Sequence, residues 1–402
     1  MPFLPCMSNK NRTFAREKGV CMAKVQIKAV KTNEEMTLFV RFPQSLYKGC
    51  WQYVPELNRD VYAMFNPRKN SALRFTDVQP FLAWKDGEVV GRIAGIVNHN
   101  ANSKWGTKNV RFGYIDFIDD EEVSKALLMA VEQWGAERGM EHIQGPLGIT
   151  DFDKEGMLVE DFDRESTMTE IYNYPYYPKH METMGFVKEA DWLQIRVAVP
   201  QDVPAKYARV SALSGEMFGL RVVKFSSSQL MGEKGHEVFR LMNKAYDPLF
   251  GFTAFTEEQI SDFLRQYVPI VDTEMIPCVL NAEGELVAAA VTIPSLSKAM
   301  KKVGGHLLPL GWWHIIQALK WKHEDTVQLL LIAVRPDLQG MGVNALIFND
   351  LIPVFNRKGF RFAETGPQLE DNVKELSQWK PLNPETIKRR RCWTKEVKNV
   401  SR

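Results

Sequence analysis

The sequence lacks an excess of charge of either sign. It has 402 residues, and its 51 Lys and Arg residues nearly balance its 49 Asp and Glu residues, which gives a formal net charge of +2. Nucleic acid and anionic membranes attract proteins through a concentrated basic field, so we expect neither as the main partner. The one short basic cluster, Lys388–Arg391, is expected to be a solvated strand or loop edge.

Cysteine and histidine spacings that would indicate crosslinks or metals are also missing. The five cysteines are an odd number without a CxxC pair, so neither a disulfide framework nor a zinc site is predicted. The seven histidines show no HxH or HxxxH spacing, and we therefore predict no bound metal. A reducing, cytoplasmic location fits this cysteine usage best.

Long apolar runs are the third feature that the sequence has little of. The first 21 residues contain no apolar run of the length that a signal peptide needs, about 7 to 15 residues, and residues 1–24 are predicted to be a disordered tail. The most apolar stretch elsewhere, Leu307–Leu319, is interrupted by polar residues and is shorter than the roughly 20 residues that cross a bilayer. No membrane span is expected.

What the sequence does contain is an internal repeat. Each half has a β-branched strand, a hairpin with an acidic-Gly turn, a short apolar strand, an amphipathic helix followed by Gly, and another strand. In the first half these segments are Val25–Val30, Phe81–Val97, Phe112–Ile118, Glu121–Arg138 and His142–Gly145. In the second half they are Leu220–Phe225, Cys278–Ile293, Val327–Val334, Gly342–Lys358 and Arg361–Glu364.

The repeat predicts the domain organisation. Strands that alternate with helices are typical of mixed α/β architecture, here with one sheet per half. We predict one domain over 25–200 and a second over 205–402. The join lies near Pro200–Pro204, where two prolines in five residues break the regular pattern.

The site chemistry is concentrated after the apolar strand of the second half. Ile332–Leu346 reads IAVRPDLQGMGVNAL: an apolar strand, a Pro-containing turn, two glycines two apart, and an apolar helix. Glycines let the backbone approach a ligand closely, and the free amides at a helix start favour phosphate. An anion site is predicted here, with a Gly-rich turn before an ordinary helix as the alternative.

This segment resembles motif A of the GNAT superfamily of N-acetyltransferases, whose loop holds the pyrophosphate of acetyl-CoA. The resemblance rests on Val334–Pro336 and Gln339–Val343, with Asn344 where the family pattern ends in Gly or Ala. It implies two tandem GNAT-like domains, each with a mostly antiparallel mixed sheet flanked by helices. The second domain would bind acetyl-CoA or another acyl-CoA.

The resemblance also implies which residues contact the acyl-CoA. The strand before the loop would align the pantetheine and the thioester, and the loop would hold the pyrophosphate. These residues are Ile332, Ala333, Val334, Gln339, Gly340, Met341, Gly342, Val343 and Asn344. Asn372 stands where the family often has a helix-start Asn near the cofactor, and it equally fits a plain helix cap.

The first half departs from the family at the corresponding turn. Phe117–Leu128 contains four consecutive acids, Asp119–Glu122, and no glycine. Carboxylates at a helix start satisfy the helix dipole themselves and repel a pyrophosphate. We therefore expect the first half to bind no CoA and to shape the acceptor site instead.

Acyl transfer to an amine needs a base that removes the ammonium proton, and an acid can protonate the leaving thiolate. Glu364, at the end of the strand after the loop, is the predicted base. The place of the family's usual acid, a Tyr after the Asn, holds Trp379. Tyr246 is the candidate acid. Alternatively, the thiolate leaves without an acid, which is possible because the pKa of a thiol is about 8.5.

Two further clusters allow more than one interpretation. Ile143–Asp163 is acidic and Asn173–Tyr177 adds three tyrosines, and a solvated acidic loop is favoured over a wall that holds a cationic amine. Leu307–Trp321 carries three tryptophans. For this segment, packing between the halves is favoured over an apolar acceptor pocket or a surface that contacts lipid.

The predicted function is acetyl transfer from acetyl-CoA to a small-molecule or peptide amine. Direct attack is expected, because the sequence contains no motif for a nucleophilic Ser or Cys. Two alternatives remain open. One is an aminoacyl or long-chain acyltransferase on the same tandem fold, and the other is a non-catalytic protein that binds acyl-CoA or serves as a scaffold.

Overall fold

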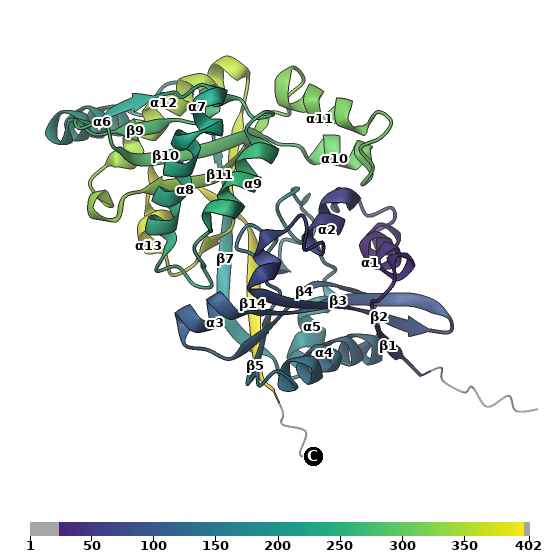
Figure 1. The fold of residues 1–402 in the computed structure, drawn as a ribbon. Helices are drawn as coiled ribbons and strands as arrows, with labels where there is room; N and C mark the ends of the chain where they lie inside the picture. Colours follow the sequence, from purple (N-terminus) through teal and green to yellow (C-terminus); the bar gives the residue numbers. More distant parts are fainter. Residues whose placement is uncertain (1–23, 398–402) are drawn as a thin grey trace, which may run out of the picture.

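The computed structural model describes residues 24–397, so the tail predicted over 1–24 lies almost wholly outside the described residues. The first half contains β1 (Gln26–Ala29), α1 (Asn33–Leu46), α2 (Asn58–Met64), η1 (Ser71–Arg74), β2 (Thr76–Lys85), β3 (Glu88–Asn98), α3 (His99–Trp105), β4 (Asn109–Phe117), α4 (Glu121–Ala136), β5 (His142–Gly145), β6 (Met157–Glu160), α5 (Tyr176–Thr183) and β7 (Val187–Ala198) (Figure 1).

The second half repeats this order with additional helices. It contains α6 (Ala205–Phe218), β8 (Arg221–Val223), α7 (Ser227–Met231), α8 (Glu233–Tyr246), α9 (Glu257–Tyr267), η2 (Thr273–Met275), β9 (Cys278–Leu280), β10 (Leu286–Pro294), α10 (Ser297–Val303), α11 (Gly311–Lys320), β11 (Thr326–Val334), η3 (Pro336–Leu338), α12 (Val343–Lys358), β12 (Phe362–Thr365), β13 (Gln368–Leu369), α13 (Val373–Ser377), η4 (Lys380–Leu382) and β14 (Glu385–Glu396). The helices η1 to η4 are short 3₁₀ helices.

The sheets of the two halves are joined by an exchange of strands. Within residues 24–397 the strand order is β1-β2-β3-β4-β5-β14-β7-β12-β11-β10-β9-β8, with β6 and β13 beside it. The last strand of the first half, β7, pairs with β12, and the last strand of the second half, β14, pairs with β5. Figure 1 shows β7 and β14 side by side between the halves, where they pair with each other. The expectation of one separate sheet per half was wrong in this respect.

Helices cover both faces of the sheet in each half, and the mostly antiparallel mixed architecture is confirmed. The parallel pairings are β4 with β5 and β11 with β12. In the first half α4 packs on one face through residues such as Leu127, and α1 packs on the other through Phe39. In the second half α12 packs on one face through Leu351 and α8 on the other through Phe239. Burial of these apolar stripes is the main favourable contribution to folding.

Two of the four residues in the basic cluster of β14 are buried, contrary to the expectation of a solvated edge. Lys388 and Arg390 are 2% and 1% exposed, and both donate to Glu170 Oε2, at 3.0 and 2.9 Å. Side chains alternate across a strand, so these two residues point to the same face. The expectation failed because β14 is a central strand that both halves cover, and a sequence window cannot reveal that position.

The expectation that no helix spans a membrane agrees with the described part of the chain. None of the helices within residues 24–397 is both long and apolar enough to cross a bilayer.

Candidate active site

The loop between β11 and α12 has the backbone conformation that its glycines predict. Gly340 and Gly342 both have φ near +80°, in the left-handed region that favours glycine. The first amides of α12, beginning at Val343, have no partner within the helix and carry the positive end of its dipole. Gln339 Nε2 closes the loop by donating to Val334 O at 3.1 Å. The loop thus has the backbone conformation that an anion site needs, and the binding of an anion there stays a prediction.

Gly342 is also required by packing. A Cβ at this position would lie 2.5 Å from Val210 Cγ1 and 2.7 Å from Ser214 Oγ, both on α6. The hydroxyl of Ser214 donates to Met341 O at 2.8 Å, so α6 holds the loop from behind. A substitution of Gly342 would therefore disturb the fold as well as the anion site.

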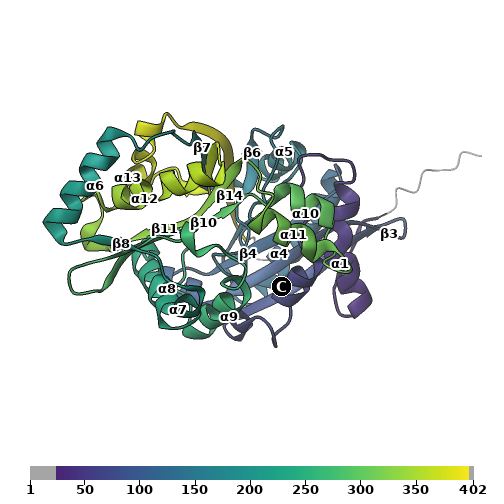
Figure 2. The same ribbon diagram turned by 90° about the horizontal axis from the view of Figure 1, so that it is seen from above.

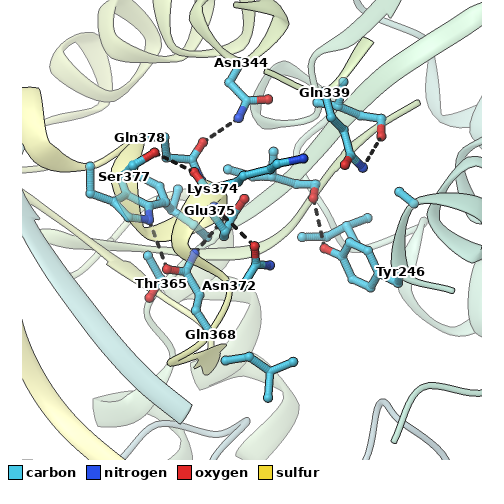
Figure 3. A pocket seen from close by; sticks show the side chains of 18 of the residues that line it. Tyr246, Gln339, Asn344, Thr365, Gln368, Asn372, Lys374, Glu375, Ser377 and Gln378 are labelled. Carbon is cyan, nitrogen blue, oxygen red and sulfur yellow. Dashed lines mark hydrogen bonds between the residues drawn. The ribbon is translucent and has the colours of Figure 1, made fainter. Parts of the chain in front are cut away.

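Asn344 joins the loop to α13. It is the second residue of α12, and its Nδ2 donates to Gln378 Oε1 at 2.7 Å (Figure 3). In this orientation the buried Nε2 of Gln378 has no hydrogen-bond partner among the residues that the structure describes. The residue that departs from the family pattern therefore fixes the first turn of α12 against the second wall of the site.

Strands β11 and β12 diverge beside the loop. They pair in parallel from Thr326 to Leu329, and a bulge in β11 follows at this point in its pairing with β10. The bulge reverses the alternation of side chains: Leu329 packs in the core against α12, whereas Leu331 and Ala333 pack in the core against α8. Beyond the bulge, one edge of β11 has no neighbouring strand within residues 24–397.

Two hydrogen bonds show which backbone groups of β11 point toward this open edge. Ile332 O accepts from the hydroxyl of Tyr246 at 3.0 Å, and Val334 O accepts from Gln339 Nε2. In an antiparallel strand the N–H and C=O of one residue point to the same side. The N–H groups of Ile332 and Val334 therefore face the open edge and can donate to a bound molecule.

A cavity of about 680 Å³ opens along this edge (Figure 3). The predicted site residues that line it are Tyr246, Ile332, Val334, Gln339, Gly340, Gly342, Val343, Asn344 and Asn372. Ala333 is fully buried on the α8 side, and the side chain of Met341 is 46% exposed; neither is among the lining residues. Asn372 also caps α13 by accepting from Glu375 N at 3.3 Å, so the helix-cap interpretation is confirmed.

Glu364 is not among the residues that line the cavity. Its carboxylate lies 3.5 Å from Arg196 on β7, and burial raises its pKa. The next residue of β12, Thr365, does line the cavity. Because neighbouring side chains of a strand point to opposite faces, Glu364 faces away from the site, and its placement does not support the role of base.

Glu375 is a carboxylate of the cavity that the sequence analysis missed. It lies on α13, lines the cavity, and accepts from Gln368 Nε2 at 2.9 Å (Figure 3). Burial raises the pKa of Glu375 to about 7. Burial raises the pKa of Tyr246, and the nearby negative charge of Glu375 raises it further. Glu375 stands one turn after Asn372, which is the only signal by which the sequence could have identified it.

Trp379 occupies the place of the family's usual acid, and its role is structural. Its side chain is 1% exposed and packs edge-on against Phe348. The indole N–H donates to Gln368 Oε1 at 3.0 Å, and the amide of Gln368 in turn reaches Glu375. Trp379 therefore helps to orient Glu375 through Gln368 and offers no titratable proton.

The first half contributes one wall of the cavity. Asp151, Glu155 and Trp192 are among the lining residues. Between the two acids, Phe152 stacks on Phe255 and Phe263 of the second half, with ring centroids 4.3 and 4.8 Å apart. This aromatic contact anchors the acidic loop to the other half, so the favoured interpretation of a solvated loop was wrong for these residues.

The acids of this wall titrate at unusually high pH. Burial raises the pKa of Asp151 to about 6, although Arg111 and a hydrogen bond from the Thr253 backbone oppose the shift. Burial and the neighbouring Asp151 raise the pKa of Glu155. It is costly to ionise two neighbouring buried carboxyl groups together, and a cation between them stabilises their charged forms. The tyrosines near residue 174 lie elsewhere: Tyr177, for example, is buried in the core of the first half.

The turn before α4 differs from the turn before α12 as the sequence indicated. Asp120 caps α4 and accepts from the backbone N–H groups of Glu122 and Val123, at 2.9 and 3.4 Å. Its carboxylate also pairs with Lys85 at 2.6 Å. The backbone amides at the start of α4 are thus engaged by a carboxylate of their own turn, whereas α12 has no side-chain cap.

Comparison with curated proteins finds two distant relatives. No protein-family model matches the chain. Protein YghO of Escherichia coli (strain K12) is 25% identical over 383 residues, which cover 92% of this chain and 95% of that protein. A bacterial ceramide synthase of Caulobacter vibrioides (strain NA1000 / CB15N) is 24% identical over 318 residues, which cover 79% of this chain and 82% of that protein.

Solved structures match the fold of the whole chain. A tandem GNAT protein from the clavulanic acid biosynthesis pathway covers 94% of this chain and 100% of its own, with a TM-score of 0.55 and 12% identity. A GCN5-related glucosamine N-acetyltransferase region of a fungal multi-domain β-N-acetylglucosaminidase covers 94% of this chain and 38% of its own, with a TM-score of 0.57 and 11% identity. This chain therefore has a tandem GNAT-like fold, as the resemblance in motif A implied.

Proposed function

We propose that the protein is an acyl-CoA-dependent N-acyltransferase whose second half binds the acyl-CoA. The observation that carries this proposal is a juxtaposition: the left-handed glycine loop and the free amides of α12 lie at one end of the open edge of β11, within one cavity. Gly340 to Asn344 would hold the pyrophosphate. The pantetheine would extend along β11 toward the bulge, and the described residues provide the donors for both parts.

The proposed chemistry uses groups of the cavity. The amine lone pair attacks the thioester carbonyl carbon, the C–S bond breaks, and an amide and CoA result. An N–H of Ile332 or Val334 would stabilise the oxyanion of the tetrahedral intermediate. Glu375, whose pKa is about 7, would take the proton that the amine loses. The hydroxyl of Tyr246 lies at Ile332 O and would donate its proton to the leaving thiolate, and the nitrogen of the tetrahedral intermediate would return its second proton to the Tyr246 oxygen.

The acceptor would be bound as a cation before it loses its proton. Asp151 and Glu155 line the cavity from the first half, and their raised pKa values indicate that a positive charge there would be favourable. This arrangement supports the hypothesis that the first half shapes the acceptor site. A primary or secondary amine, protonated at neutral pH, is the substrate class that these residues fit.

The acyl chain is proposed as acetyl, with a long chain as the second candidate. One observation favours the longer chain, namely that one relative, at 24% identity, is a ceramide synthase. Ceramide is the amide of a fatty acid and a long-chain amino alcohol. A long-chain donor and a long-chain amino alcohol are therefore the alternative substrates.

Calorimetric titration followed by a thiol-release assay tests the proposal. We expect micromolar binding of acetyl-CoA or of palmitoyl-CoA, and the tighter ligand identifies the donor. Release of CoA is then followed with a panel of amines that includes a long-chain amino alcohol. Binding without release over the whole panel would favour a non-catalytic protein. Absence of binding by both donors would refute an acyl-CoA site in the second half.

A further inference from the structure

The helical hairpin α10–α11, inserted between β10 and β11, has two unlike faces. Its inner face packs between the halves: Met300 and Leu319 share a buried cluster with Val54 of the first half. The backbone is fixed there as well, because Asn58 N donates to Gly305 O at 3.0 Å. Figures 1 and 2 show the hairpin beside the first half, above α1 and α2 in Figure 1. The prediction of packing between the halves is thus confirmed for this face.

The outer face carries an exposed group of large apolar side chains, which we call the tryptophan surface. It consists of Leu308, Leu310, Trp312, Trp313 and Trp321, which are 78%, 65%, 44%, 41% and 64% exposed. The three indole rings are contiguous, because the centroid of Trp313 lies 5.8 Å from that of Trp312 and 5.7 Å from that of Trp321. A contiguous apolar patch on a protein surface marks an interaction site more often than scattered apolar residues do.

The segment that carries this surface is basic, although two of its lysines, Lys298 and Lys301, pair with Glu324 and Glu165. Residues 297–323 contain five lysines and no Asp or Glu. Lys302, Lys320 and Lys322 are exposed, and none of the ion pairs within residues 24–397 involves them. The net charge of +2 conceals this concentration, because acids elsewhere in the chain balance it.

We propose that the tryptophan surface docks on an anionic lipid bilayer. Tryptophan rings favour the boundary between headgroups and acyl chains, while lysines beside them reach the phosphates of the headgroups. A second copy of this chain fits less well. A symmetric dimer would place the same surface of both copies together, and the unpaired lysines would then face one another.

Co-sedimentation with vesicles tests this proposal. Vesicles of phosphatidylcholine alone are compared with equimolar mixtures of phosphatidylcholine and phosphatidylglycerol. We expect the full-length protein to partition about tenfold or more in favour of the anionic vesicles, and high salt to reduce this preference. The tryptophan fluorescence should shift to the blue on binding, because indoles leave water.

Matched double variants identify the surface that binds. The double variant Leu308→Ser, Trp321→Ser removes the most exposed leucine and the most exposed tryptophan of the surface. We expect it to bind vesicles about tenfold less well than the wild type. The control is Leu213→Ser with Met217→Ser, which removes two exposed apolar side chains from α6 and should leave vesicle binding unchanged. Circular dichroism and acyl-CoA titration of each variant separate loss of folding or of the cofactor site from loss of docking.

Three results would overturn the proposal. The first is the absence of any preference of the wild type for anionic vesicles. The second is an equal loss in both double variants. The third is a lipid-free dimer, observed by light scattering, that the Leu308→Ser, Trp321→Ser variant abolishes, because the tryptophan surface would then be an interface between copies of the chain. None of these results depends on whether the second half transfers acyl groups.

Discussion

Substitution of Asn344 by Asp is the sharpest test of the anion site. The two side chains have the same shape, and the substitution places a negative charge on the first turn of α12. The hydrogen bond to Gln378 need not be lost, because the amide of Gln378 can rotate and donate its Nε2, which has no partner in the present orientation. A carboxylate at this position also favours the helix dipole by about 0.3 to 1 kcal/mol. The unliganded variant should be at least as stable as the wild type.

The cost should instead fall on acyl-CoA binding. A charge about 6 Å from a phosphate is repelled by about 0.7 kcal/mol at an effective permittivity of about 80 and by about 3 kcal/mol at about 20. We expect about 2 kcal/mol for this partly exposed site, which corresponds to an about 30-fold increase in Kd. Because exposed charges are screened by salt, the increase should shrink at high ionic strength.

Isothermal titration calorimetry with acyl-CoA measures the effect, and thermal unfolding monitors stability. Asn344→Ala is the matched control, because it removes the same amide without adding a charge. The reasoning is refuted if Asn344→Asp leaves Kd unchanged within about threefold, since a phosphate near this turn must feel the charge. An equal loss in Asn344→Ala would assign the effect to the Gln378 contact and would contradict the electrostatic explanation.

Three further predictions concern the base, the acceptor wall and the strand exchange. Glu375→Gln should lower kcat about 100-fold or more and abolish the rise of activity with pH through about 7, where the wild-type carboxyl loses its proton. The control Glu364→Gln should keep the wild-type kcat and pH profile. Equal losses in the two variants would contradict the assignment of Glu375 as the base. Phe152→Ala should raise KM for the amine without changing Kd for acyl-CoA, and a weaker acyl-CoA complex would count against a wall that serves the acceptor alone. Glu170→Gln should lower the free energy of unfolding by about 3 kcal/mol in urea titrations at pH 7, because two buried cations lose their partner; an unchanged midpoint would be incompatible with this picture. The pKa of Glu170 is lowered to about 2, so its contribution is present above about pH 4.5 and disappears as pH falls toward 2.

The backbone conformation of the glycine loop before α12 could be predicted because it is local. The positive φ of Gly340 and Gly342 and the free amides that follow them depend on a few consecutive residues. The absence of glycine before α4 was informative for the same reason, since Asp120 caps that helix from its own turn. The repeat of strand and helix patterns sufficed for the mixed α/β class, because periodicity is set by which face each element buries.

The carboxylates that line the cavity could not be predicted in this way. Glu364 and Thr365 are neighbours in the sequence, yet only Thr365 lines the cavity, because the pleat of β12 turns the two side chains to opposite faces. Which face is the cavity depends on where β11 diverges from β12, at the bulge after Leu329. Asp151 reaches the cavity because Phe152 packs among aromatic rings about a hundred residues later in the chain.

The sequence by itself determined the repeated elements, the glycine turn before α12 and the absence of such a turn before α4. Those features follow from backbone conformations and helix ends, which extend over a few residues. Only the tertiary structure decided that β14 lies between β5 and β7, that Lys388 and Arg390 surround a buried Glu170, and that the cavity is built from both halves. Such features depend on pairing between residues more than two hundred positions apart, as in Trp393 beside Gly145, and that pairing is set by the burial of the whole sheet.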